Sequence, residues 1–352
     1  MVQMVKSANM NGLLDNDHES HKYQNVVKEK LQMLLNCDKD FVEADKEKLS
    51  PTGSVSVIKA MNFVVNPFRV CERIYSIMCR LLDGIRELCT QPKADEMKLY
   101  HGESWELMIR RWNKLVKDFG MKNDQYDISK IPDIYDCIRY DLQHNMKTLR
   151  FTEAEELHAY AKAMADIVIP QEYGITKDEK VLIAQCICAP LLKKILGDLQ
   201  RNVEEDSTRL DSRYSTGVST PHRHVKTRLY FTSESHIHSL LAILRYGGLV
   251  DTEKDQQWAR AMEYINCVSE LNYMTQIVIM LYEDPTKDVQ SEERFHVELH
   301  FSPGAYTCGQ KKKDPNSLGY RSQIKEKKVP ESFSLTPVCV CCNSPIINNI
   351  TT

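Results

Sequence analysis

Residues 222–248 read HRHVKTRLYFTSESHIHSLLAILRYGG, and this stretch decides the predicted fold. A β-prone run, Leu229–Thr232, predicts a short strand. Ser233 suits the start of a helix, because a hydroxyl side chain can accept a hydrogen bond from the first turn. Apolar residues then recur at helical spacing from Ile237 onward, and Gly247 is typical of a helix end. The stretch therefore predicts a strand that leads directly into a helix.

More strand patterns follow this helix. A second helix is expected over about 255–270. An apolar run over 276–282 is typical of a buried strand, and 295–301 alternates apolar and polar residues as a half-buried strand does. The order strand, helix, helix, strand, strand predicts an α/β layer with a parallel or mixed sheet. The polar, lysine-rich residues from 306 onward predict a disordered tail.

The pattern upstream is predominantly helical. Apolar residues recur at helical spacing over 26–35, over 70–85 and over 105–115, and further helices are expected at 153–167 and 178–200. A proline in the first turn of a helix is tolerated, so Ile131-Pro132 predicts another helix start. Residues 55–200 therefore form one large helical insertion in the predicted fold.

The composition excludes several functions. Lys plus Arg total 46 and Asp plus Glu total 49 among 352 residues, so the formal net charge is −3. This balance excludes a general attraction to nucleic acid or anionic membranes, and any anion site must be a local cluster. No apolar run approaches the roughly 20 residues of a transmembrane helix, and the first residues lack the apolar core of a secretory signal. The 12 scattered cysteines predict reduced thiols in a cytosolic protein.

Cationic and hydroxyl side chains gather around the predicted strand and the start of its helix. Backbone N–H groups at a helix N-terminus favour phosphate, arginine binds phosphate through two hydrogen bonds, and histidine can transfer a proton near neutral pH. The pattern predicts a phosphate site; the alternative is a solvated basic loop before an ordinary helix. The expected phosphate ligands are His222, Arg223, Lys226 and Arg228, and the histidines of the helix are His236 and His238.

Two patterns raise the alternative of a metal site. His296, Glu298 and His300 share one face of an expected strand and could hold zinc, although the polar face of a half-buried strand has the same pattern. Cysteines 339, 341 and 342 include one C-x-x-C spacing, and Cys308 is the only other cysteine near them in the sequence. A structural zinc site needs four ligands, so we predict no metal site there.

Phosphate-binding loops and nucleophile motifs are missing from the sequence. Arg223-His224 superficially resembles the Arg-His pair of a phosphohistidine nucleophile, but no glycine follows it and no strand pattern precedes it. The sequence contains no G-x-x-x-x-G-K-[ST], no G-x-G-x-x-G and no G-x-S-x-G. Nothing in it therefore identifies an ATP site.

Four long stretches resemble one known family, the diphosphoinositol pentakisphosphate kinases of the Vip type, in their phosphatase-like domain. The resemblance covers roughly residues 1 to 305. The stretches are not of low complexity, which makes the resemblance specific. They are DISKIPDIYDC at 127–137, VIPQEYGI at 168–175, RLYFTSESH at 228–236, and SELNYMTQ through FSPG at 269–304.

The resemblance implies a fold and a division of the chain. Domains of the histidine acid phosphatase superfamily have an α/β core with an inserted helical cap. The chain is expected to be an N-terminally truncated α/β histidine phosphatase-like fold with a large α-helical insertion. The expected parts are the start of the chain within this domain at 1–54, the helical cap at 55–215, the later part of the α/β core at 216–305 and the tail at 306–352.

The resemblance also implies a site. In that family the histidine of an Arg-His-Gly-x-Arg-x-Pro-like motif attacks phosphorus, and a second histidine lies at the end of a late strand. His236 is the expected counterpart of this second histidine, with His238 as the alternative. Ile237 follows His236 where many members have an acidic residue, so the conventional proton donor is missing. The nucleophile motif is also absent from the sequence.

The implied function is part of a bifunctional inositol pyrophosphate enzyme, with inositol polyphosphates as ligands. An ATP-grasp kinase domain, which uses ATP and Mg, phosphorylates inositol hexakisphosphate and its 5-diphospho form, and a phosphatase domain removes that phosphate. This chain is expected to need no cofactor and to be catalytically incompetent alone. The alternative is a non-catalytic inositol polyphosphate-binding or scaffold protein. A sheet without an early strand would expose an apolar edge, so a protein partner covering that edge is also expected.

Overall fold

The computed structural model describes residues 17–92, 94–204, 227–249, 253, 255–288 and 291–305. The predicted tail at 306–352 and the cysteines in it lie outside these residues. The helices and strands are α1 (Asp17–Leu35), α2 (Glu43–Leu49), α3 (Val55–Val64), α4 (Pro67–Cys89), α5 (Trp105–Phe119), α6 (Ile131–His144), α7 (Met146–Leu149), α8 (Ala154–Gln171), α9 (Lys177–Glu204), α11 (Glu234–Tyr246), α12 (Gln256–Cys267), β1 (Gln276–Glu283) and β2 (Phe295–Ser302).

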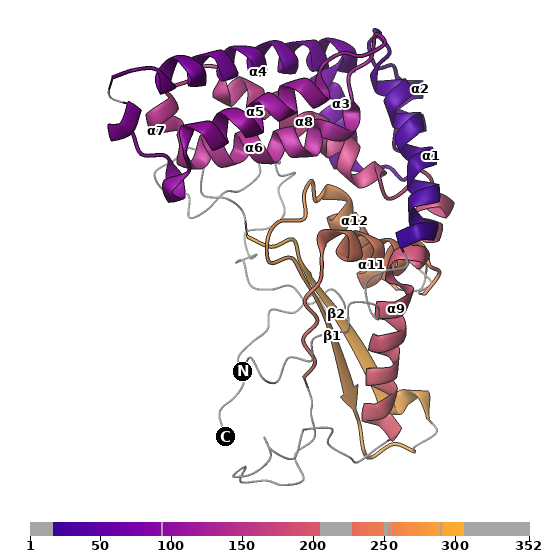
Figure 1. Cartoon of the computed structure of the whole chain (residues 1–352). Helices are drawn as coiled ribbons and strands as arrows, with labels where there is room; N and C mark the ends of the chain where they lie inside the picture. Colours follow the sequence, from indigo (N-terminus) through magenta and orange to yellow (C-terminus); the bar gives the residue numbers. More distant parts are fainter. Residues whose placement is uncertain are drawn as a thin grey trace, which may run out of the picture.

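Helices α3 to α8, which we call the helical block, surround one hydrophobic core (Figure 1). The apolar stripe predicted over 70–85 is the buried face of α4. Asn66 caps this helix by accepting a hydrogen bond from the backbone N–H of Arg69, and Pro67 occupies the first turn. Leu31 and Leu35 of α1 are buried in the same core. The first described helix is therefore part of the core around which the block is built.

The remaining elements lie on one side of the helical block. Helix α11 packs along α9, and α12 contacts α3. Strands β1 and β2 are antiparallel, with Gln276 opposite Ser302 and Glu283 opposite Phe295. Figure 1 shows this two-stranded ribbon beside α9, on the side of α11 and α12 away from the block. The helix that carries His236 is thus held between α9 and the block.

Three predictions about the sheet were wrong. Leu229–Thr232 forms no strand, and Leu229 and Phe231 are 76% and 81% exposed. A β-prone run becomes a strand only when another strand pairs with it, and β1–β2 is the only sheet among the described residues. This sheet is antiparallel rather than parallel or mixed. Residues 276–282 do form a strand, yet Val278 and Tyr282 are each 43% exposed, because a two-stranded ribbon cannot bury both faces.

The helices of the structure are all too short or too polar to span a bilayer, as far as the described residues go. This matches the lack of any long apolar run in the sequence.

Candidate functional site

The start of α11 positions His236. Ser233 is the N-cap, with extended backbone angles, and the helix begins at Glu234 as the sequence predicted. The His236 side chain is directed inward and is only 5% exposed. Its Nδ1 lies 3.0 Å from the Ser233 hydroxyl, which is itself 2.8 Å from the Ser235 hydroxyl. The two serines therefore fix the plane of the imidazole, as an acid–base group requires.

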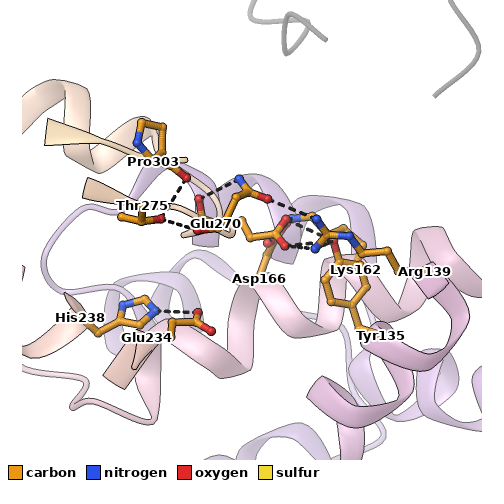
Figure 2. Close-up of polar contacts among 10 residues, drawn as sticks. Tyr135, Arg139, Lys162, Asp166, Glu234, His238, Glu270, Thr275 and Pro303 are labelled. Carbon is orange, nitrogen blue, oxygen red and sulfur yellow. Dashed lines mark hydrogen bonds and ion pairs between the residues drawn. The ribbon is translucent and has the colours of Figure 1, made fainter. Parts of the chain in front are cut away.

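His238 has different surroundings, because two residues advance a helix by more than half a turn. Its ring stacks on Tyr173, at 4.6 Å between ring centroids and 17° between planes. Its Nε2 lies 3.2 Å from the Glu234 carboxylate (Figure 2). Tyr173 belongs to the loop after α8, so this contact ties α11 to the helical block. The two histidines thus have different surroundings: His236 is buried beside Ser233, and His238 contacts the block.

Carboxyl groups gather near the same helix start. Burial raises the pKa of Asp136 and of Glu172, and the Glu234 charge adds to both shifts. A buried carboxyl with a raised pKa is a feature of proton-transfer sites and of structural clusters alike. Because these groups are anionic when ionised, a phosphate beside this helix start would need cations from elsewhere in the chain.

The predicted cations are only partly described. His222, Arg223 and Lys226 lie outside the described residues, as does the Arg223-His224 pair. The structure places Arg228 against α9, with its Nε 3.6 Å from the Asp198 carboxylate. Tyr230 donates a hydrogen bond to the same carboxylate at 2.5 Å. Arg228 is therefore held toward α9, and its predicted role as a phosphate ligand stays a prediction.

A second cluster, which we call the Glu270 network, was missed by the sequence reasoning (Figure 2). Glu270, in the segment between α12 and β1, forms an ion pair with Arg139 of α6. The Tyr135 hydroxyl donates to Glu270 at 3.1 Å, and the Lys162 ammonium of α8 lies 3.7 Å from it. Lys162 also pairs with Asp166 one turn further along α8. The network thus joins two helices of the block to the segment that precedes the ribbon.

The Glu270 network perturbs several ionisation equilibria. Burial, more than any charge, raises the pKa of Tyr135. Burial also raises the pKa of Asp166 from 3.8 to about 6, against the opposing effect of Lys162. The pKa of His158 is lowered by burial and by the Lys162 charge. Such shifts arise wherever several charges share a poorly hydrated space, and they make the cluster a candidate for a positioning role.

The same segment closes a tight turn against the end of β2. The Thr275 hydroxyl donates to the backbone oxygens of Asn272 and Pro303, at 2.6 and 3.1 Å. The Asn272 backbone N–H also donates to Pro303, at 2.9 Å. Gly304 has φ +84°, and a side chain there would lie 2.5 Å from the Tyr273 backbone oxygen. This close approach is why a glycine follows Pro303.

The structure does not give His296, Glu298 and His300 the arrangement of a metal site. The Glu298 carboxylate lies 3.6 Å from His296 Nε2 and 3.3 Å from His300 Nε2, so the three side chains do share a face of β2. The Tyr282 hydroxyl also donates to Glu298 at 3.2 Å. No group of three histidine, cysteine or acidic side chains has metal-binding geometry in the part of the chain that the structure describes. The polar face of a strand explains these residues.

The start of α11 and the Glu270 network bring together the four motif stretches, which are 127–137, 168–175, 228–236 and 269–304. Tyr173 and the helix that begins after Ser233 meet at His238, whereas Tyr135, Glu270 and Pro303 belong to the Glu270 network and the turn beside it. Residues far apart in sequence are therefore brought together by the fold. The only sequence signal for the Glu270 network was that its residues lie in the unusual stretches. No regular spacing of charged residues indicated it.

Comparisons with known proteins agree with this picture. The family model of the histidine phosphatase superfamily (branch 2) matches residues 4–302. The chain is 59% identical over 330 residues to inositol hexakisphosphate and diphosphoinositol-pentakisphosphate kinase 2 of Xenopus laevis, covering 93% of the chain and 29% of that protein. It is 57% identical over 337 residues to the Homo sapiens kinase 2, covering 95% and 27%, and 46% identical over 322 residues to the Caenorhabditis elegans kinase, covering 88% and 24%.

The chain thus spans less than a third of the length of these relatives. No solved structure matches it. The predicted fold class, an α/β histidine phosphatase-like fold with a large helical insertion, is confirmed by the family match and by a mostly helical structure with a small sheet. The resemblance to the phosphatase-like domain of the Vip-type kinases is confirmed by the relatives. The chain belongs to branch 2 of the histidine phosphatase superfamily.

Proposed function

We propose that the chain supplies the second-histidine half of an inositol pyrophosphate phosphatase site, and that it does not turn over substrate alone. The observation that carries this is the placement of His236, fixed by Ser233 at the start of α11, in a chain without an Arg-His-Gly sequence. The relatives are named as kinases of inositol hexakisphosphate and diphosphoinositol pentakisphosphate, which supports a densely phosphorylated inositol as the ligand.

The division of labour follows from the chemistry. Hydrolysis through a phosphohistidine needs a nucleophilic histidine that bonds to phosphorus and arginines that neutralise the phosphoryl oxygens. His236 can offer a proton to the departing phosphate oxygen, but it does not replace the nucleophile. In our proposal the cationic residues His222, Arg223, Lys226 and Arg228 provide the positive charge beside it. Kinase chemistry with ATP and Mg belongs to another part of the proposed enzyme.

A segment exchange tests the role of His236. Residues 4–302 of this chain would replace the matching part of the Xenopus laevis relative, and phosphate release from a 1-diphosphoinositol substrate would be measured. His236→Ala is expected to lower release at least about 100-fold, the usual scale for loss of an acid–base group. His238→Phe is the matched control, because it keeps an aromatic ring against Tyr173, and it should leave most of the activity. Loss of activity in His238→Phe with full activity in His236→Ala would reverse the assignment.

The chain by itself tests the second part of the proposal. Incubated with the same substrate, it should release no phosphate above the buffer background, since no nucleophile is present. Sustained release by the chain alone that His236→Ala removes would show that the chain is an enzyme in its own right. This experiment leaves the segment exchange unaffected, because the exchanged protein regains the nucleophile from its host.

The second candidate function is non-catalytic binding of inositol polyphosphate as a scaffold protein. The absence of a nucleophile motif from the sequence supports this candidate as well as it supports the first one. Calorimetry with inositol hexakisphosphate distinguishes the two candidates when done on folded chain and on an Arg223→Gln, Lys226→Gln, Arg228→Gln variant. Binding that the triple variant loses, without any activity in the exchanged protein, supports the scaffold. No heat at protein concentrations well above micromolar contradicts it.

We also propose that a protein partner covers the exposed apolar residues Leu229 and Phe231. Both side chains are largely exposed, and neither belongs to a sheet. Exposed apolar edges promote association. Phe231→Ser is expected to reduce light scattering by the concentrated chain, whereas Tyr273→Ser, at a side chain that is 84% exposed, serves as the control. A monomeric chain with unchanged scattering in both variants would contradict this part.

A further inference from the structure

A small cavity lies behind α11, on the side of the helix that also carries His238. Its volume is about 110 Å³, and it is lined by the end of α2, the start of α3, the end of α8, the start of α9, α11 and the segment after α12. At about 30 Å³ per water molecule this is room for several waters or for one small polyatomic ion. Its polar lining includes Gln171, Lys180, Arg245 and Tyr246. None of these residues belongs to the site proposed above.

Two cations line this cavity without an anionic partner. The Lys180 ammonium donates to the backbone oxygens of Pro170 and Gly174, at 3.1 and 2.6 Å. One guanidinium nitrogen of Arg245 donates to the Asn266 side chain. No carboxylate lies within ion-pair distance of either cation among the residues that the structure describes. Both side chains are partly buried, and a charge that is partly removed from water is stabilised by an opposite charge.

The electrostatics of the cavity favour an anion. Burial, and after it the Arg245 charge, lower the pKa of Lys180 from 10.5 to about 8. Burial also lowers the pKa of Arg245. Glu270 lines the same cavity, but its carboxylate is engaged by Tyr135, Arg139 and Lys162. The net charge that faces the empty space is therefore positive.

Several polar atoms of the lining have no hydrogen-bond partner. These are both amide atoms of Gln171, which is 2% exposed, the Nε of Arg245 and the hydroxyl of Tyr246. Almost all buried polar atoms in native proteins are hydrogen-bonded to protein, water or ligand. Water could satisfy these atoms, but water cannot neutralise two cations. A tetrahedral oxyanion can neutralise the cations and accept hydrogen bonds from the Gln171 amide nitrogen, the Arg245 Nε and the Tyr246 hydroxyl, which leaves the Gln171 amide oxygen for a water molecule or a P–OH group.

We propose that this cavity binds a single phosphate group between Lys180 and Arg245, with Gln171 and Tyr246 as neutral donors. The phosphate group comes either from free orthophosphate or from one arm of an inositol polyphosphate. The proposal does not depend on the role of His236, because neither cation lies on the first turn of α11.

Thermal unfolding in sodium phosphate and in sodium chloride of equal ionic strength tests the proposal. Phosphate at about 100 times its dissociation constant should raise the melting temperature of the chain by about 5 °C relative to chloride. Arg245→Met and Lys180→Met should each lose this rise. Arg110→Met removes one exposed charge from α5 and should keep it. Line broadening of the ³¹P signal by the unmodified chain gives a second measurement that needs no variant.

The outcomes distinguish free orthophosphate from an inositol arm, and the cavity proposal from the proposed phosphatase role. A rise with orthophosphate that the cavity variants lose assigns free phosphate; a rise with inositol hexakisphosphate alone that they lose assigns an inositol arm. No rise and no line broadening with either compound, or a rise that both cavity variants retain, overturns the proposal. His236→Ala should keep the rise, so a failure of the cavity and a failure of the proposed phosphatase role give different results.

Discussion

Asp166→Asn is expected to stabilise the protein at neutral pH, although it removes an ion pair with Lys162. The Asp166 side chain is 17% exposed, and the Lys162 side chain 24%. Burial raises the pKa of Asp166 to about 6, which means that its surroundings favour the protonated carboxyl despite the nearby ammonium. Asparagine is neutral and has the same shape as that protonated form. The substitution therefore removes the unfavourable ionisation of a buried group, while Lys162 keeps its contact with Glu270.

The magnitude and its pH dependence follow from proton linkage. The folded protein binds the Asp166 proton more tightly than the unfolded chain, so wild-type stability is highest below the unfolded pKa of 3.8 and falls as the pH rises through the folded pKa of about 6. A shift of roughly 2 pKa units corresponds to about 3 kcal/mol. Asp166→Asn should match wild type near pH ~4 and exceed it by up to about 3 kcal/mol near pH ~7.

Urea unfolding between about pH 4 and about pH 8 measures this difference. The matched control is Asp118→Asn, because Asp118 lies one turn after Lys114 on α5 in an exposed pair of the same spacing, at 2.8 Å. The Lys114 hydrogen bond lowers the pKa of Asp118, so this substitution should leave stability unchanged or reduce it slightly above pH ~4. An Asp166→Asn protein that is less stable than wild type at neutral pH, or a difference that does not vary with pH, would refute the reasoning.

Four further substitutions probe the fold and the network. Gly174→Ala should destabilise by more than about 1 kcal/mol in urea unfolding, because φ is +107° and a Cβ would lie 2.5 Å from the Lys180 backbone nitrogen; Gly84→Ala, in open space on α4, should stabilise by about 0.5–1 kcal/mol. Asp141→Asn should cost about 3–5 kcal/mol, since the buried carboxylate accepts four hydrogen bonds. Glu270→Gln should lower the pKa of Asp166, followed by NMR titration, because the Glu270 charge helps to raise it.

The local features of the fold followed from the sequence. The stripe of α4 and the start and end of α11 at Ser233 and Gly247 were predicted correctly, because helical spacing acts within a few residues. The capping itself differs: the Ser233 hydroxyl bonds to His236 Nδ1 instead of a backbone N–H, and Gly248 rather than Gly247 has a positive φ. The alternation over 295–301 likewise predicted β2. Each of these signals depends on neighbours in the chain, which a sequence displays directly.

Features that depend on distant residues did not follow from the sequence. Glu270 and Arg139 are 131 positions apart, so no spacing rule pairs them. The run Leu229–Thr232 has the composition of a strand but forms none, because strand formation requires a partner and composition does not supply one. The sequence also does not show which way His236 and His238 point. The structure does, because it places Tyr173 against His238.

The contacts that hold α11 determine where His236 can act. His238 is stacked on Tyr173, which lies outside α11, and this contact restricts the rotation of the helix about its axis. The rotation in turn directs His236 toward the interior, beside the Ser233 hydroxyl. A change at Tyr173 would therefore alter the orientation of a histidine that it does not touch. The family stretch around Tyr173 and the stretch before His236 thus specify one geometric feature together, although about 60 residues of sequence separate them.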